Sequence, residues 1–296
     1  MLCYWQSGKA GQFFNPSKSS SYQSVRCSSE VCRAMHKSSG VFSGCVHEID
    51  ACLYRKIYVS GQYSAGYLVR DKLTLPNNYT IDDFIFGCGA DNLYSGSNAG
   101  AIGFGDESYS FFNQVARQTN YRAFSYCFPS DHGSEGFLSI GPYVRDEKLM
   151  LTRLISDGHY LKFYAIQQVD MSVNGIQLEV DPGIYGTAVT VVDCGTTDSF
   201  ILSPVFNALD KAVTTAMLAK GYPRGSAKDR ICFATTDEPI DWSDLPTVEM
   251  KFGVSTTLVL RMENVFYVNS DGGICLTFQP DDAAAHKGFK FLGIEH

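Results

Sequence analysis

One short segment of the sequence combines residues that could do acid–base chemistry. Residues 188–197 read AVTVVDCGTT, so a run rich in β-branched residues ends in Asp193, which is followed by Cys194, Gly195 and two threonines. The run predicts a buried strand and the glycine a tight turn, whose amide and hydroxyl groups could orient the carboxylate. Such a carboxylate suits acid–base catalysis, and an Asp that merely begins an ordinary turn fits the same local pattern.

Other common catalytic signatures are absent from the sequence. It contains no G-x-S-x-G, G-x-x-x-x-G-K-[ST] or H-E-x-x-H motif and no EF-hand loop, which are the signatures of serine hydrolases, P-loop enzymes, zinc proteases and calcium sensors. Residues 103–105 read GFG and lack the third glycine of a dinucleotide-binding loop, so a turn is the better interpretation. The sequence therefore indicates no cofactor and no metal.

Composition narrows the classes of partner. The 296 residues include 24 Lys and Arg against 31 Asp and Glu, a net charge of −7, and the basic residues are scattered singly. Nucleic acid is therefore not expected as a partner. Every apolar run ends well before the roughly 20 residues that a membrane helix needs, so no membrane partner is expected either. Residues 1–8 have neither the basic nor the apolar part of a secretory signal.

The cysteines predict a disulfide framework. Ten are present, at positions 3, 27, 32, 45, 52, 88, 127, 194, 232 and 275. With only six His in the chain and no C-x2-C spacing, disulfides are favoured over a zinc site. Asn78 begins an N-glycosylation sequon, N-Y-T. Both features indicate an oxidising compartment, although residues 1–8 carry no signal for it, and we interpret this conflict as a missing amino terminus.

Short apolar runs between turn residues predict a mostly β chain with few helices. The 27 Gly and 10 Pro divide the chain into these runs. Predicted strands cover residues 67–69, 72–75, 84–86, 137–140, 164–166, 189–192, 257–260, 265–268 and 288–292. One helix is predicted over residues 204–220, with Ser203 as its cap and Gly221 after its end, and a shorter one over 111–117. The longer helix has apolar residues at every fourth position, at Val205, Leu209, Val213 and Met217.

The Asp193 segment resembles the second Asp-Ser-Gly-Thr-Thr signature of the pepsin-like aspartic endopeptidases, peptidase family A1, with Cys194 in place of the serine. Five further segments resemble landmarks of the plant nepenthesin-type branch and occur in the same order. They are residues 14–22, 86–89, 101–105, 124–127 and 291–293. The resemblance implies a mostly β, bilobal pepsin-like (acid protease) fold with a few short helices, incomplete at both termini. Its amino-terminal lobe would span residues 1–147 and its carboxy-terminal lobe residues 148–296, with the boundary in the charged segment 143–148.

The mechanism of that family needs two aspartates. One carboxylate from each lobe shares a proton with the other, so that one activates water while the other polarises the scissile carbonyl. Asp193 matches the second aspartate. The first should lie upstream of Cys3, and no other Asp in this sequence is followed by Ser-Gly or Thr-Gly. The resemblance therefore implies a chain truncated at both ends, without the catalytic strand of its first lobe and without the final strand of its second.

The resemblance also implies where a peptide would bind. Tyr58 matches the tyrosine of the family's flap and Gly61 a flap glycine, whereas Val59 replaces a hinge glycine, so closure of the flap is in question. The expected substrate-binding residues are Tyr58, Gly61, Gly195, Thr196 and Thr197.

The disulfide pattern of the family implies four bonds. They are Cys27–Cys52, nested around Cys32–Cys45, then Cys3–Cys88 and Cys232–Cys275. Cys127 would bond to a cysteine that this sequence lacks, and Cys194 replaces a serine, so both are expected to be free. A cysteine hydrolase at Cys194 is disfavoured, because the adjacent carboxylate raises the thiol pKa and no His is placed by sequence to activate it.

Two functions are carried forward. The first is an aspartic endopeptidase that cuts peptides in acid, with only its second Asp in this chain, so that the chain as written is expected to be inactive. The alternative is a non-catalytic protease-like binding protein on the same scaffold, such as a glycoside-hydrolase inhibitor. The expected partner of this chain is a peptide or protein substrate, and the chain is expected to be a monomer. The full-length parent is expected to be extracellular or vacuolar.

Overall fold

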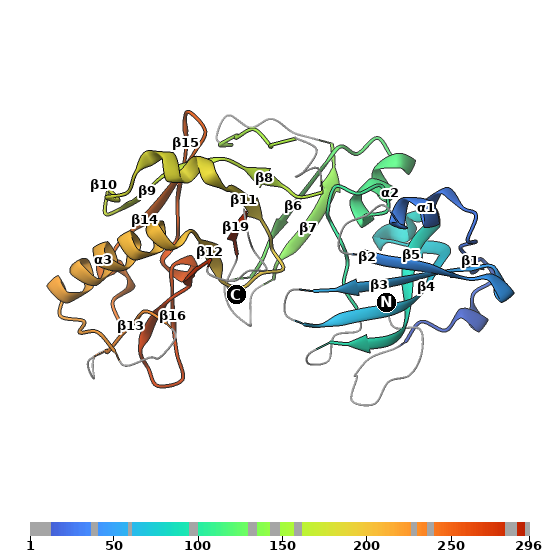
Figure 1. The fold of residues 1–296 in the computed structure, drawn as a ribbon, viewed down its shortest axis with the longest axis horizontal. Coiled ribbons are helices and arrows are strands. Elements are labelled where there is room, and N and C mark those ends of the chain that lie inside the picture. Colours follow the sequence, from blue (N-terminus) through green and yellow to red (C-terminus); the bar gives the residue numbers. More distant parts are fainter. Residues whose placement is uncertain are drawn as a thin grey trace. The chain divides into compact units, whose positions relative to one another are not determined.

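The chain folds as two compact units (Figure 1). The first comprises Met1–Phe124 and Ile140–Tyr143, and the second comprises Ser125–Ser139 and Val144–His296. The computed structural model describes residues 13–36, 41–58, 61–94, 100–129, 135–142, 149–156, 162–225, 230–235, 240–281 and 289–293. Both units consist mainly of strands, as predicted. The expected lobe boundary in segment 143–148 lies outside the described residues and stays a prediction.

One antiparallel sheet organises the first unit. Its strands are β1 (Gln23–Ser24), β2 (Val41–Val46), β3 (Ala51–Ile57), β4 (Tyr63–Thr74) and β5 (Thr80–Leu93). They lie in the order β1-β4-β3-β2, and β5 also pairs with β4. The helical segments of this unit are η1 (Pro16–Lys18), α1 (Glu30–His36), η2 (His47–Ile49), η3 (Pro76–Asn78) and α2 (Phe111–Gln118). Ser110 caps α2 by accepting a hydrogen bond from the Asn113 amide, so the shorter predicted helix is confirmed.

Three sheets form the second unit. One has the order β10 (Ile176–Gln177), β9 (Gln168–Val173), β14 (Val248–Phe252), β15 (Thr256–Val259). Another has the order β18 (Phe278–Pro280), β12 (Ser199–Ile201), β19 (Phe289–Leu292), β11 (Val189–Val192), β8 (Ala165–Ile166). The third has the order β13 (Cys232–Phe233), β17 (Ile274–Leu276), β16 (Phe266–Val268). Its helical segments are η4 (Pro182–Thr187), α3 (Ser203–Ala219), η5 (Trp242–Asp244) and η6 (Met262–Asn264). A separate two-stranded sheet pairs β6 (Ala123–Cys127) with β7 (Phe137–Gly141), and neither strand falls wholly within the second unit.

Helix α3 packs its apolar stripe into the core of the second unit. The four residues predicted to form that stripe are at most 1% exposed, and the helix contacts β9 and β18. Gly221 has a φ of +87° after the helix, as predicted for a left-handed C-terminal residue. The predicted cap is wrong: Leu202 occupies the N-cap position without a side-chain hydrogen bond, and Ser203 is the first helical residue. Pro204 in the first turn has no amide to be capped, which makes a capping side chain less necessary.

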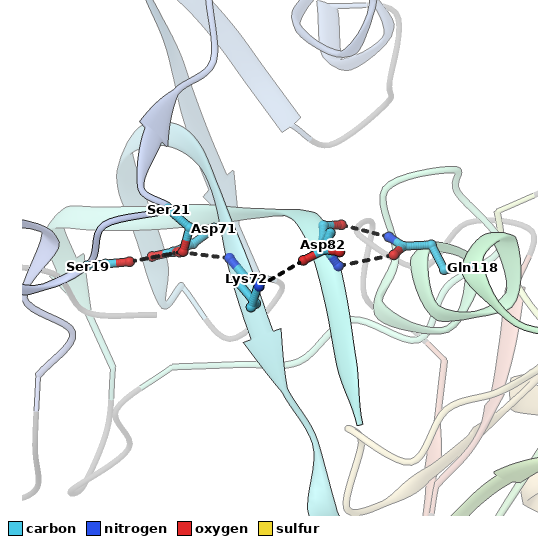
Figure 2. Close-up of polar contacts among 6 residues, drawn as sticks. All are labelled: Ser19, Ser21, Asp71, Lys72, Asp82 and Gln118. Carbon is cyan, nitrogen blue, oxygen red and sulfur yellow. Dashed lines mark hydrogen bonds and ion pairs between the residues drawn. The ribbon is translucent and has the colours of Figure 1, made fainter. Parts of the chain in front are cut away.

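A buried carboxylate joins the segment that holds Ser19 and Ser21 to the first unit's sheet (Figure 2). Asp71 on β4 is 6% exposed and accepts hydrogen bonds from Ser19 Oγ at 2.8 Å, Ser21 Oγ at 2.5 Å and the Lys72 amide at 2.7 Å. Lys72 Nζ lies 3.4 Å from Asp82 on β5. Burial disfavours the charged form of Asp71, but the three donors outweigh that effect and hold its pKa below the usual value.

The disulfides correct one predicted pairing. Cys27 bonds to Cys45 with a Cα–Cα distance of 5.6 Å, and Cys32 bonds to Cys52 at 5.9 Å, in place of Cys27–Cys52 and Cys32–Cys45. Cys45 and Cys52 face each other in the β2–β3 register, so the hairpin presents both to the preceding segment. Helix α1 buries Cys32 against buried Cys52, and the half-buried Cys45 is left for Cys27.

The remaining cysteines that the structure describes agree with the prediction. Cys232 and Cys275 are bonded and stand opposite each other on β13 and β17. Cys88 is disulfide-bonded, and its predicted partner Cys3 lies outside the described residues. Cys127 and Cys194 have free, exposed thiols in the described structure.

Candidate active site

The strand that carries Asp193 is buried and pinned on both sides. Strand β11 pairs with β19 in parallel and with β8 in the antiparallel direction, and its Thr190 and Val191 are at most 2% exposed. Strand β12, which follows the Asp193 turn, also pairs with β19. The turn between β11 and β12 therefore wraps around the end of β19, with the three strands side by side in Figure 1. The strand predicted over residues 189–192 is confirmed.

The turn orients the carboxylate of Asp193 with two donors. The Gly195 amide donates to Oδ1 at 2.9 Å, and the Thr196 hydroxyl donates to Oδ2 at 2.7 Å. Each carboxylate oxygen can accept two hydrogen bonds, so this half-buried group keeps acceptor capacity beyond the turn. A carboxylate that is held in one orientation and still accessible can bind a water molecule or a substrate carbonyl through a shared proton.

Two glycines allow the backbone to pack this closely. A Cβ on Gly195 would lie 3.2 Å from Asp193 Oδ1. Gly293, at the end of β19, approaches the turn so closely that its Cβ would lie 2.3 Å from the carbonyl oxygen of Asp198. The Gly293 amide donates to Ser199 Oγ at 3.2 Å, and the Asp193 amide donates to the Leu292 carbonyl at 3.2 Å. The landmark predicted at residues 291–293 thus lies directly against the Asp193 turn.

Cys194 places a thiol beside the carboxylate. Its pKa is raised by partial burial and then by the negative charge of Asp193, while a hydrogen bond with Tyr126 lowers it. Tyr126 on β6 also has a raised pKa, caused by burial and by the neighbouring Cys194 and Asp193. A raised pKa keeps the thiol protonated at neutral pH, which agrees with the expectation that Cys194 is not a nucleophile.

Sequence reasoning missed an ion pair at the far end of the turn. Asp198 accepts two hydrogen bonds from Arg230, at 2.8 Å from Nη1 and 2.6 Å from Nη2. The guanidinium carbon of Arg230 lies 5.3 Å from the centre of the Tyr267 ring. The two partners are 32 positions apart in the sequence and carry no local signal, because a pairing at that separation depends on tertiary structure.

The expected flap is a hairpin of the first unit. Strands β3 and β4 pair from Ile57 opposite Tyr63, and the Tyr58 amide donates to the Gln62 carbonyl at 2.9 Å. Gly61 has a φ of +80°, which a glycine adopts readily. Val59, the expected substitution at the hinge, lies outside the described residues.

The aromatic ring of Tyr58 has two neighbours within the first unit. The ring centre of Tyr94 lies 6.3 Å away, and Lys56 Nζ lies 6.0 Å from the Tyr58 ring centre. Burial and then Tyr94 raise the pKa of Tyr58, so this phenol stays protonated. The roles of Tyr58, Gly61, Gly195, Thr196 and Thr197 in substrate binding stay predictions.

Other predicted features were located as well. Asn78 is exposed with a φ of 58°, a position open to modification, although no observation tests its glycosylation. Among the described residues, no group of three or more His, Cys, Asp and Glu side chains could hold a metal ion. None of the helices described is both long and apolar enough to cross a membrane.

Comparison with known proteins places this site in a family. A family model described as the xylanase inhibitor N-terminal domain matches residues 2–142, and one described as the xylanase inhibitor C-terminal domain matches residues 163–290. The chain is 31% identical over 280 residues to an aspartyl protease family protein of Arabidopsis thaliana, covering 92% of this chain and 57% of that protein. It is 28% identical over 274 residues to aspartic proteinase nepenthesin-1 of Nepenthes gracilis, covering 89% of this chain and 60% of the relative.

Solved structures share the fold. Conglutin gamma, a basic 7S globulin from lupine seeds, matches with a TM-score of 0.72 and 17% identity over 93% of this chain and 77% of that one. Basic 7S globulin from soybean matches with a TM-score of 0.68 and 16% identity over 93% of this chain and 78% of that one. These likenesses confirm the expected fold class, which is the mostly β, bilobal pepsin-like fold.

Fold and site together define a pepsin-like protein with an Asp-x-Gly-Thr-Thr turn in its carboxy-terminal half. The chain belongs to the plant pepsin-like aspartic protease family, and the nepenthesins are among its relatives. It spans less than two thirds of the length of the two curated relatives described above.

Proposed function

We propose that Asp193 is one of the two carboxylates of an aspartic endopeptidase site that hydrolyses peptide bonds in acid. The observation that carries this proposal is the orientation of Asp193 by the Gly195 amide and the Thr196 hydroxyl at 2.9 and 2.7 Å. Those donors fix the carboxylate while leaving it accessible. When a second carboxylate lies close by, the two cannot both ionise easily, and the pair holds one proton between them.

The proposed chemistry divides between the two carboxylates. The ionised member would accept a proton from water as the water attacks the scissile carbonyl, and the protonated member would donate to the carbonyl oxygen. The printed sequence has one Asp in the required context, since no other Asp precedes Ser-Gly or Thr-Gly. We therefore expect this 296-residue polypeptide alone not to cleave peptides, and we expect a longer form with a second such Asp to do so.

A second candidate is a protein-binding role without cleavage. Cys194 occupies the position of the family's serine, and Val59 occupies that of a flap glycine. Both matching family models are described as xylanase inhibitor domains, so the partner in this case would be a glycoside hydrolase. Such binding would use the surface of the scaffold and would not require the carboxylate of Asp193.

Two assays on the 296-residue chain separate the candidates. The first follows a fluorogenic peptide between pH 3 and 5, and the second measures binding of a plant-cell-wall xylanase by calorimetry. No cleavage and no xylanase binding are expected if the chain holds only one half of a peptidase site. Tight xylanase binding that is equal in the wild type and Asp193→Asn would support the second candidate. Cleavage by this chain that Asp193→Asn abolishes would contradict the need for a second carboxylate.

A further inference from the structure

Asp198 and Arg230 connect the Asp193 turn to a different sheet of the second unit. We infer that this ion pair positions the catalytic turn, residues 193–198, by fixing its far end to the three-stranded sheet β13-β17-β16. The inference rests on the proposed function for its catalytic meaning. The effect of the ion pair on the position of the turn does not depend on catalysis, so it is tested without a peptidase assay.

The pair has the geometry of a specific contact. Arg230 and Asp198 form two parallel hydrogen bonds of 2.8 and 2.6 Å, and their side chains are 34% and 15% exposed. Two-point contacts of this kind fix the mutual orientation of the guanidinium and carboxylate planes, which a single-point contact does not. The Arg230 guanidinium also packs over the Tyr267 ring, a cation–π contact that helps to hold the side chain.

The sheet that begins two residues after Arg230 and includes Tyr267 is a firm anchor. Ile231 is buried, and its carbonyl accepts a hydrogen bond from the Leu276 amide at 2.9 Å. The next residue, Cys232, forms a disulfide with Cys275, and Tyr267 stands opposite Cys275 in the β16–β17 register. Arg230 is therefore held by backbone pairing, a covalent bond and an aromatic ring within a few residues.

The backbone of the turn is tightly packed between Asp193 and Asp198. The carbonyl oxygens of Thr196 and Asp198 would lie 2.6 and 2.3 Å from a Cβ on Gly293, so both pack against the backbone of that residue. Thr196 in turn donates its hydroxyl to Asp193. A shift of Asp198 would consequently displace Thr196 and disturb the donor that orients the Asp193 carboxylate.

A second Arg–Asp pair in the same unit provides a matched control. Arg224 contacts Asp210 of α3 through both of its terminal nitrogens, and its guanidinium carbon lies 5.7 Å from the centre of the Phe233 ring. It thus repeats the chemistry of an arginine held between a carboxylate and an aromatic ring. Asp210 belongs to α3 and not to the catalytic turn, so loss of this pair should affect stability without altering the turn.

Cys194 reports on the turn without any need for peptidase activity. It is one of two free thiols in the described structure, so a Cys127→Ser background removes the other. In that background the rate of alkylation by iodoacetamide is measured from pH 6 to 10, while circular dichroism confirms folding. Arg230→Ala and Asp198→Asn should speed alkylation at pH 8 by about threefold or more and move the midpoint toward that of an ordinary thiol, because loosening the turn moves the Cys194 thiol away from the negative charge of Asp193. Arg230→Lys should give an intermediate result, and Arg224→Ala should match the background.

The inference is overturned if Arg230→Ala and Asp198→Asn leave both the rate and the midpoint unchanged, or if Arg224→Ala changes them equally. The double variant Asp198→Arg/Arg230→Asp distinguishes loss of the ion pair from a folding defect. It exchanges the two charges and should restore slow alkylation if the ion pair itself matters. Failure of the proposed function would instead appear as peptide cleavage by the longer form that does not depend on Asp193, and it would leave the alkylation result intact.

Discussion

Asp71 in the first unit and Asp193 in the second are two carboxylates held by nearby hydroxyl and amide donors, yet they differ in what remains accessible. Asp71 accepts from two serines and an amide and is 6% exposed, whereas Asp193 accepts from one threonine and one amide and is only half buried. The two serine donors of Asp71 come from a segment 50 or more residues away, whereas both donors of Asp193 come from its own turn. Long-range donors around a buried charge indicate a structural role, and local donors around an accessible charge indicate a chemical one.

The comparison predicts losses of stability of very different size for the same kind of substitution. Replacing Asp71 with Ala leaves Ser19, Ser21 and the Lys72 amide without their acceptor in a buried place, so the free energy of unfolding should fall by about 3 kcal/mol. Urea unfolding followed by circular dichroism measures this loss. Asp193→Ala is the matched variant and should cost less than about 1 kcal/mol, since its donors can turn to water. Equal losses would remove the distinction between the two carboxylates.

Removing one of the two serines that donate to Asp71 should have a smaller effect on stability. Ser21→Ala removes one charge-assisted hydrogen bond to Asp71 but leaves those from Ser19 and Lys72, so the expected loss is about 1 to 2 kcal/mol. Ser17→Ala is a suitable control, because Ser17 donates to exposed Asn15 and not to Asp71. If both serine variants lose the same stability in the same urea titration, the network in Figure 2 does not anchor the segment that holds Ser19 and Ser21.

The smallest predicted effect is a dependence on pH. The pKa of Asp71 is lower in the folded chain than its ordinary value of 3.8, so the unfolded state takes up the proton first as the pH falls. Its contribution to stability is fully present above the unfolded pKa and is lost as the pH falls from about 4 through the folded value. The difference in unfolding free energy between wild type and Asp71→Asn should therefore be constant from pH 7 to 5 and shrink below pH 4. A difference that grows in acid would contradict this assignment.

Features encoded locally could be predicted from the sequence. The apolar stripe of α3 and the strand before Asp193 were found because a helix repeats near every fourth residue and a buried strand is rich in β-branched residues. Gly195 was recognised because its turn is continuous in sequence with Asp193. Strand and turn patterns along the chain indicated a mostly β protein, and the motifs that resemble the nepenthesin-type branch implied the pepsin-like fold.

Features that join distant residues could not be predicted in this way. The Asp198–Arg230 pair and the contacts of Ser19 and Ser21 with Asp71 bring together residues whose own neighbourhoods carry no signal. The same limit explains the wrong disulfide pairing, since Cys45 and Cys52 are opposite each other and only the packing of α1 decides which of them meets Cys32. The structure therefore adds most where tertiary contacts select among pairings that the sequence leaves open.

The most direct test of the central claim concerns Asp193 in a form of this protein that also carries an upstream Asp-Thr-Gly-Ser segment. Such a form is sought by sequencing the transcript and the gene upstream of Met1, and it is expressed as wild type, Asp193→Asn and the control Asp271→Asn, which alters an exposed turn residue. We predict that kcat/KM for an acid peptide substrate near pH 4 falls by about a thousandfold or more in Asp193→Asn and is unchanged in Asp271→Asn. If the Asp193→Asn variant cleaved the substrate with the kcat/KM of the wild type, the assignment of Asp193 as a catalytic carboxylate would be contradicted.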